Sequence, residues 1–147
     1  MHKNGYWAVL PDERSSNIFD KLCLALDYDP ANNEHPYHCT LAYDDRNPEQ
    51  TAEPDPTKVF KAQISGFALF GEDKDVLVAL IHSPELQEEH KRIHQDGTMH
   101  YDFPEYNAHV TLVETGATED MLEYMIDMAA VPIPVEFSGE YTETLED

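Results

Sequence analysis

Apolar and polar residues along the chain fall into runs whose period predicts strands and helices. An apolar run at residues 6–10 predicts a strand, and the segment from about Ser15 to Leu26 repeats its apolar positions at helical spacing. A second strand is predicted around residues 37–41. Strand, helix and strand therefore follow one another in the first part of the chain.

The same order returns later in the chain. An apolar run at residues 76–81 predicts a strand, and a helix follows it, with Ser83 as its cap, Pro84 in its first turn and Gly97 as its stop. A strand around residues 108–112 completes the repeat. Two such units related by an approximate two-fold axis would face each other across one cleft.

The remaining segments add a helix, a strand and a loop. We expect a helix over residues 118–130 and a closing strand within residues 132–145. That helix has four apolar positions that we expect in the core, Met121, Leu122, Met125 and Ile126. The stretch from Asp44 to Thr57 is rich in proline and acidic residues and has no periodicity, which is typical of a lid beside a cleft or of a plain surface connection.

A short motif occurs in the last strand of each unit. His38-Cys39-Thr40-Leu41 and His109-Val110-Thr111-Leu112 share the pattern His-x-Thr-Leu. Because side chains alternate along a strand, each motif places its histidine and threonine on one face, about 6 to 7 Å apart, with apolar residues behind. A single His-x-Thr is typical of ordinary strand residues, but two copies in matching context favour a shared chemical role.

Paired imidazoles and hydroxyls suit the cleavage of phosphoesters. A neutral imidazole removes a proton from the attacking hydroxyl or water, and a protonated one gives a proton to the leaving oxygen. Two threonine hydroxyls can donate hydrogen bonds to the non-bridging phosphate oxygens. Histidine fits both roles because its ordinary pKa is close to neutrality. This chemistry needs no metal and no cofactor, and the sequence does not say which histidine is the acid.

These residues resemble the two-histidine (2H) phosphoesterase superfamily, which has paired His-x-Thr/Ser motifs in two pseudo-symmetric lobes. The resemblance extends over nearly the whole chain, since residues 64–71 and 76–81 look like the central hairpin of that family. It implies an α+β fold with antiparallel sheets and outer helices around a central cleft. It also implies catalytic roles for His38, Thr40, His109 and Thr111. Among its members, the chain looks most like the phage-encoded anti-CBASS phosphodiesterases, which destroy cyclic oligonucleotide signals.

Length and hydropathy predict one domain in the cytoplasm. A chain of 147 residues forms a single core, with lobes at about residues 1–58, completed by the last strand, and 59–130. The N-terminus lacks the apolar run of a signal peptide, and no stretch is long enough to span a membrane. Cys23 and Cys39 fall on apolar faces, so we expect buried thiols rather than a disulfide or a nucleophile.

The charge of the chain limits which kinds of ligand it can bind. Nine basic residues stand against thirty acidic ones, a formal charge of −21, so the average field repels a long nucleic acid. A small cyclic nucleotide suffers less repulsion and can be bound by base stacking. Tyr6 is our first candidate for stacking and Trp7 the second, with burial of both in the core as the alternative. The oligomeric state stays open.

A second motif favours a different chemistry. His90, His94 and His100 have the spacing of an extended zinc-protease signature with Gly97 between them. Lys91 stands where such an enzyme has its glutamate, and a lysine neither acts as that base nor favours a nearby dication. We therefore expect a solvated helix face here and keep a zinc-binding protein as an alternative.

The sequence analysis thus predicts a metal-independent phosphodiesterase that cleaves 3′–5′ bonds of small cyclic oligonucleotides. Two further alternatives stay open beside the zinc-binding protein. One is a phosphodiesterase that acts on 2′,3′-cyclic phosphate ends of RNA. The other is a protein that binds or sequesters nucleotides without turnover.

Overall fold

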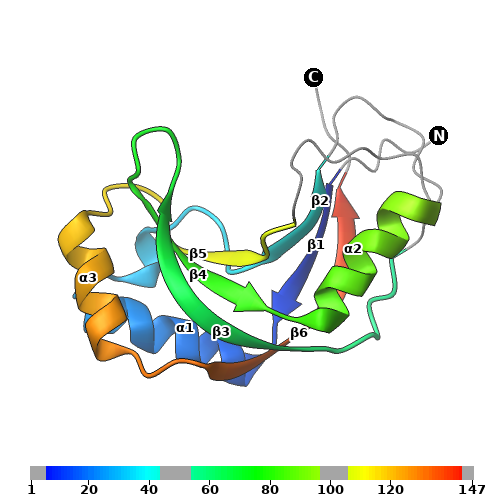
Figure 1. Ribbon diagram of the computed structural model, residues 1–147, viewed down its shortest axis with the longest axis horizontal. Helices are drawn as coiled ribbons and strands as arrows, with labels where there is room; N and C mark the ends of the chain where they lie inside the picture. Colours follow the sequence, from blue (N-terminus) through cyan, green and yellow to red (C-terminus); the bar gives the residue numbers. More distant parts are fainter. Residues whose placement is uncertain (1–5, 44–53, 97–105, 144–147) are drawn as a thin grey trace.

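The protein is an α+β fold of six strands and three α-helices over the residues that its structure, a computed structural model, describes: 6–43, 54–96 and 106–143 (Figure 1). The elements in order are β1 (Tyr6–Pro11), α1 (Glu13–Ala25), the short 3₁₀ helix η1 (Pro30–Asn32), β2 (Cys39–Tyr43), β3 (Phe60–Phe70), β4 (Val76–His82), α2 (Pro84–Asp96), β5 (His109–Val113), α3 (Glu119–Met128) and β6 (Ile133–Glu143). The predicted α+β class, the hairpin of β3 and β4 and the closing strand are confirmed.

The six strands form one sheet that closes on itself in the order β1-β2-β5-β4-β3-β6, with every neighbouring pair antiparallel. Two separate small sheets were expected, one in each lobe. They are joined because β3 and β6, each 11 residues long, pair with each other, while β2 and β5 meet at Cys39 and Val110.

The repeat of strand, helix and strand is present in the fold. β1, α1 and β2 form the first copy, and β4, α2 and β5 form the second. In both copies the two strands are antiparallel neighbours, so each helix bridges adjacent strands. The final strands of the two copies, β2 and β5, lie next to each other, and each carries or directly follows a motif histidine.

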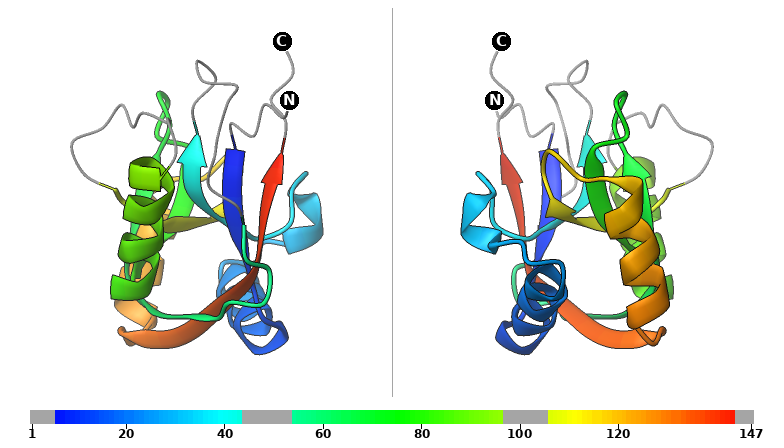
Figure 2. Two further views of the ribbon diagram at one scale, coloured as in Figure 1. Left: turned by 90° about the vertical axis from the view of Figure 1, so that its right-hand side faces the viewer. Right: turned by 90° about the vertical axis from the view of Figure 1, so that its left-hand side faces the viewer.

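The helices lie outside the sheet, with α2 and α3 on one side and α1 on the other (Figure 2). α1 packs against β1, β5 and β6 and buries Phe19, Leu22 and Cys23. α2 packs against β2 and β3 and buries Leu86 and Ile93. Apolar side chains on the backs of β2 and β5 therefore lie under helices, which leaves the opposite faces of these strands for polar groups.

Side-chain caps fix where the helices begin. The Oδ1 atom of Asp12 accepts a hydrogen bond of 2.8 Å from the backbone N–H of Ser15, so α1 begins two residues before the predicted start. The predicted cap Ser83 is confirmed, because its hydroxyl accepts the N–H of Leu86 at 3.1 Å. The predicted stop at Gly97 lies outside the described residues.

The apolar face predicted for α3 is only partly buried. Met125 is fully buried, and Met121 and Leu122 pack against the core from half-buried positions. Ile126 is 54% exposed, so its prediction as a core residue is wrong. The reason is that α3 lies at the edge of the fold and contacts β3, which covers only part of its circumference.

A buried ionic cluster fastens α2 to β6. Both carboxyl groups, Glu89 on α2 and Glu140 on β6, are almost fully buried. Arg92 binds Glu89 through two hydrogen bonds of 2.7 and 2.9 Å and lies 3.6 Å from Glu140. Burial and the neighbouring Glu89 raise the pKa of Glu140 above its usual range. The cluster holds α2 behind β2, which carries the first motif.

The described helices include none that is long and apolar enough to cross a membrane.

Candidate active site

The pairing of β2 with β5 brings the two motifs onto one face. Cys39 is the register partner of Val110, and both side chains are fully buried. Because side chains alternate, the motif histidines and threonines project from the opposite face. Continuing the antiparallel register by one residue puts His38 opposite Thr111 and Thr40 opposite His109. The two motifs therefore face the same side of the adjacent strands, and His38 and Thr111 line one pocket.

Both motif histidines are held in the same way by the backbone. The Nδ1 atom of His38 lies 2.9 Å from the carbonyl oxygen of Pro36, and Nδ1 of His109 lies 2.9 Å from that of Asn107. A carbonyl oxygen only accepts, so Nδ1 carries the hydrogen in both rings. The Nε2 atom of each ring is therefore the one that exchanges a proton, and this tautomer is set by the carbonyl two residues earlier in each motif.

The surroundings of His109 are apolar. The ring of Phe70, on β3, meets the His109 ring edge-on with centroids 4.8 Å apart. Burial lowers the pKa of His109, the hydrogen bond to the Asn107 carbonyl acts in the opposite direction, and the nearby His38 lowers it further. His109 is therefore neutral at neutral pH, as a general base must be.

The surroundings of His38 are aromatic and polar. The ring of Tyr6, on β1, lies edge-on to His38 with centroids 6.3 Å apart, and its hydroxyl is hydrogen-bonded to the Thr40 hydroxyl at 3.0 Å. Tyr141, on β6, lies beside Tyr6 at a centroid distance of 6.3 Å. Trp7 points into the core on the other face and is fully buried. Of the two aromatic candidates for stacking, only Tyr6 reaches the face of the motifs.

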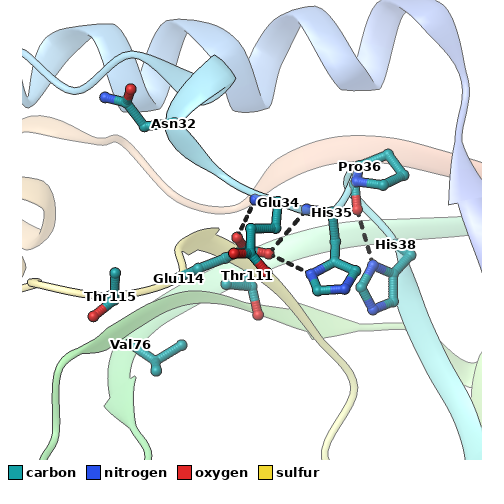
Figure 3. A pocket seen from close by; sticks show the side chains of 9 residues that line it. All are labelled: Asn32, Glu34, His35, Pro36, His38, Val76, Thr111, Glu114 and Thr115. Atoms are coloured by element: carbon teal, nitrogen blue, oxygen red, sulfur yellow. Dashed lines mark hydrogen bonds and ion pairs between the residues drawn. The ribbon is translucent and has the colours of Figure 1, made fainter.

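A pocket of about 520 Å³ opens beside the motifs, and His38 and Thr111 both line it (Figure 3). His35 and Glu114 line the same pocket, and the His35 ring lies between Glu114 and His38. The sequence analysis missed this pair. The one feature of the sequence that points to this pair is that both residues are close to the motifs. His35 lies just before the first motif, and Glu114 lies just after the second.

A protein-family model matches almost the whole chain. The family model described as anti-CBASS protein Acb1 matches residues 4–147. The chain belongs to the Acb1 family. Membership indicates a role in phage counter-defence against signalling by cyclic oligonucleotides, and it confirms the resemblance to the anti-CBASS group. No curated protein matches the chain.

The two cysteines of this Acb1-family chain are free and buried, as predicted. Burial raises the pKa of the Cys39 thiol to about 11, although hydrogen bonds from Tyr106 and the backbone of His109 act to lower it. Burial also raises the pKa of Cys23. Both thiols are protonated at neutral pH, and Cys39 lies on the face opposite to the motif histidines. Neither cysteine is placed to act as a nucleophile.

The zinc-protease signature falls only partly within the described structure. The Nδ1 atom of His90 lies 2.8 Å from the Leu41 carbonyl oxygen, and its ring stacks on Tyr106 with centroids 4.2 Å apart. His90 thus packs α2 against β2. The side chain of His94, all of His100 and residues 44–53 of the predicted loop lie outside the described residues. Among the side chains that are described, no group of three potential ligands is placed to hold a metal ion.

Proposed function

We propose that this Acb1-family chain is a metal-independent phosphodiesterase that hydrolyses 3′–5′ bonds in small cyclic oligonucleotides. The observation that carries the proposal is the matched pair His38 and His109. Both rings stand on one face of the adjacent strands β2 and β5, and both have Nδ1 occupied by a backbone carbonyl. We also propose that the chain belongs to the 2H superfamily and that a pseudo-two-fold axis between β2 and β5 relates its halves.

In the proposed reaction, the neutral His109 is the general base. Its Nε2 takes the proton of the attacking hydroxyl or water while the new P–O bond forms. His38 is the general acid, and its Nε2–H gives a proton to the leaving oxygen as the old P–O bond breaks. The assignment rests on burial, because the Phe70 ring and the low exposure of His109 favour its neutral form.

The threonines supply hydrogen bonds to the phosphate. Thr40 and Thr111 project from the same face of β2 and β5 as the two histidines, because each lies two residues after its histidine. Each can donate a hydrogen bond to a non-bridging oxygen, whose negative charge grows in the transition state. The described structure shows no hydrogen bond to the Thr111 hydroxyl, and the Thr40 hydroxyl is bonded to Tyr6.

The charge of the chain and its family favour a small cyclic substrate. A formal charge of −21 disfavours binding of long RNA, which needs clustered basic residues. The Acb1 family acts against signalling by cyclic oligonucleotides, which carry few phosphates. Tyr6, at the edge of His38, offers a ring on which a base can stack. The site of action would be the cytoplasm of the infected cell.

The test is a panel of substrates with product identification by mass. Purified protein is incubated with cyclic di- and trinucleotides and with RNA ends that carry a 2′,3′-cyclic phosphate, with and without EDTA. We expect cleavage of a cyclic oligonucleotide that is unchanged by EDTA and lost in His109→Ala. Preference for RNA ends would favour the RNA-end phosphodiesterase, and binding without turnover would favour a sequestering protein. Loss of activity in EDTA with recovery in zinc would favour the metal site of His90.

A further inference from the structure

The segment that leads into the first motif is fastened to the end of the second motif strand. Within the described strands, β2 and β5 pair in register at Cys39 and Val110 alone. Towards the start of β2 the backbone ladder is interrupted at Pro36, which has no N–H. The carbonyl oxygen of Pro36 is taken up by the Nδ1–H group of His38. Side chains make the connection to β5 there instead of the backbone.

Asn33 makes one half of this connection. Its Nδ2 group donates to the Leu112 carbonyl oxygen at 2.8 Å, and its Oδ1 atom accepts the N–H of Glu114 at 3.1 Å. One side-chain amide thus satisfies an acceptor and a donor at the end of β5, as the backbone of a neighbouring strand would. The hydroxyl of Tyr28 donates to the same Oδ1 atom at 2.5 Å.

The orientation of the Asn33 amide follows from its partners. The Leu112 carbonyl only accepts and the Glu114 N–H only donates, so Nδ2 faces the first and Oδ1 the second. An aspartate has the same planar, branched shape, but it has no donor and would set a carboxylate oxygen against the Leu112 carbonyl. Of these two side chains, only asparagine therefore fits both partners.

Glu114 makes the other half of the connection. Its carboxylate accepts hydrogen bonds from the backbone N–H groups of Glu34 and His35, the second at 3.1 Å (Figure 3). Burial acts to raise the pKa of Glu114, but the hydrogen bonds from Glu34 and His35 outweigh it and lower that pKa, so the group is a carboxylate at neutral pH. Each of the two side chains thus binds the backbone around the other. We call the contacts of Asn33 and Glu114 the clasp.

The clasp fixes the group that orients His38. It holds residues 33–35, and Pro36 follows directly, with a ring that restricts its own backbone. The Pro36 carbonyl oxygen lies 2.9 Å from Nδ1 of His38 and sets the tautomer of that ring. On the other strand, Leu112 directly follows Thr111. The clasp therefore ties the carbonyl that holds one motif to the strand that carries the other.

We propose that Asn33 is a positioning residue, which keeps His38 in the orientation and the tautomer that proton transfer through Nε2 requires. The inference rests on the proposed function, since it assumes that His38 is the general acid. Asn33 is outside the described lining of the pocket beside the motifs, so it acts on the reaction through His38 and not through a contact with the substrate.

The test replaces Asn33 by aspartate, which keeps the Oδ1 acceptor and loses the donor to Leu112. We expect kcat for the best cyclic oligonucleotide to fall about 10- to 100-fold, because a small displacement of a catalytic group lowers the rate steeply. KM should stay unchanged, since no contact with the substrate is lost. Circular dichroism checks that the variant is folded.

A second measurement follows the His38 ring itself. Nitrogen NMR at alkaline pH shows which nitrogen of each neutral imidazole carries the hydrogen. In the unaltered protein, His38 and His109 should both carry it on Nδ1. In Asn33→Asp the His38 signals should move towards a mixture of the two tautomers, while His109, held by the Asn107 carbonyl, should stay as it is. A general loss of structure would instead change both rings.

Two further variants complete the test. Asn17→Asp makes the same chemical change at an exposed position of α1 and should alter neither the rate nor the tautomers. If Asn33→Asp does not fold, Glu114→Gln weakens the clasp from the other side, because a neutral oxygen accepts the N–H groups of Glu34 and His35 less strongly. It should change kcat and the His38 tautomer in the same direction and by a smaller factor.

The outcomes separate this inference from the proposed function. If kcat falls without a change in the His38 tautomer, if both rings change, or if nothing changes, the inference is overturned while the phosphodiesterase stands. If the unaltered protein cleaves no substrate, the proposed function fails, and the tautomers still decide whether Asn33 holds His38. A His38 tautomer that does not depend on Asn33 would then overturn both.

Discussion

The two halves of the molecule present the same motif on the same backbone but surround it differently. In each half a strand, a helix and a second strand lead to His-x-Thr, and a carbonyl two residues earlier fixes the histidine tautomer. His38 then meets the phenol of Tyr6 and lines an open pocket, whereas His109 meets the ring of Phe70. The repeat supplies two like groups, and their neighbours make them unlike.

This difference matters because acid and base catalysis need opposite protonation states. Two identical imidazoles in identical surroundings would compete for one proton, and neither role would be assigned. Burial of His109 lowers its pKa and resolves that competition in favour of a neutral His109. In the proposed mechanism, this burial, to which the Phe70 ring from β3 contributes, assigns the role of the base to His109.

The strongest test of the comparison removes each imidazole in turn. His38→Ala and His109→Ala should each lower kcat by about 10² to 10⁴, because each removes one proton transfer from the reaction. The measurement is the initial rate of cleavage of the best cyclic oligonucleotide, with folding checked by circular dichroism. The double variant should lose much less than the product of the two single losses, since the histidines act as one unit. Near-normal turnover in either single variant would contradict the mechanism.

Removing the hydroxyls should have a smaller effect. Thr40→Ala and Thr111→Ala should each weaken binding of the transition state by about 1 to 3 kcal/mol, because each removes one donor to a phosphate oxygen. The measurement is kcat/KM at a fixed pH. Thr→Ser variants, which keep the hydroxyl, serve as controls and should recover most of the loss. An Ala variant with unchanged kcat/KM would show that its hydroxyl does not meet the phosphate.

The role of the aromatic residues near His38 can be tested by comparing substitutions at two adjacent positions, Tyr6 and Trp7. Tyr6→Ala should raise the KM for a cyclic oligonucleotide by the equivalent of about 1 to 3 kcal/mol if a base stacks there, with little loss of folded protein. Trp7→Ala should instead affect mainly folding. Loss of its fully buried ring leaves a cavity, so the free energy of unfolding should fall by about 3–5 kcal/mol. Thermal denaturation and steady-state kinetics separate the two effects. An unchanged KM in Tyr6→Ala would remove this residue from the substrate site.

The smallest expected effect comes from a substitution in the environment of His109. Its pKa is lowered by burial, so the neutral base is lost only when the pH falls through a value below the ordinary pKa of histidine. Phe70→Ala admits water to the ring and should raise that pKa, which moves the acid limb of the bell-shaped profile of kcat/KM to higher pH. Phe70→Leu keeps the site apolar and is the matched control. An acid limb that stays in place would show that His109 is not the base.

Many features of the two halves could be predicted from short stretches of the sequence. Apolar runs predicted the strands, helical spacing predicted the helices, and alternation placed only one of Tyr6 and Trp7 on the motif face. These features depend on residues that are close in sequence. The predicted start of α1 is two residues late, because the prediction did not include Asp12 as the helix cap. Ile126 is exposed although its helical spacing predicts burial, because periodicity does not show how much of a helix the adjacent strand covers.

The groups that distinguish the two halves could not be predicted, because they come from distant segments. Phe70 reaches His109 from another strand, and Glu114 reaches His35 from the end of β5. Neither pairing follows from a local period. The register of Cys39 with Val110, which brings the motifs together, is likewise set by how β2 and β5 meet. Sequence therefore predicts which groups are present more readily than which groups touch.

The pairing of β1 with β6 bears on how the protein matures during synthesis. β1 is the first described strand to leave the ribosome, and β6, which covers one of its edges from Tyr6 to Pro11, is the last. Contacts between segments so far apart in sequence form slowly, since a long loop must close before they stabilise anything. Until then β1 exposes an unpaired edge that can join a neighbouring chain. The edge of β1 that pairs with β6 is thus covered only after nearly all of the described chain has been made, and a protein cut short within β6 would leave this edge open to aggregation.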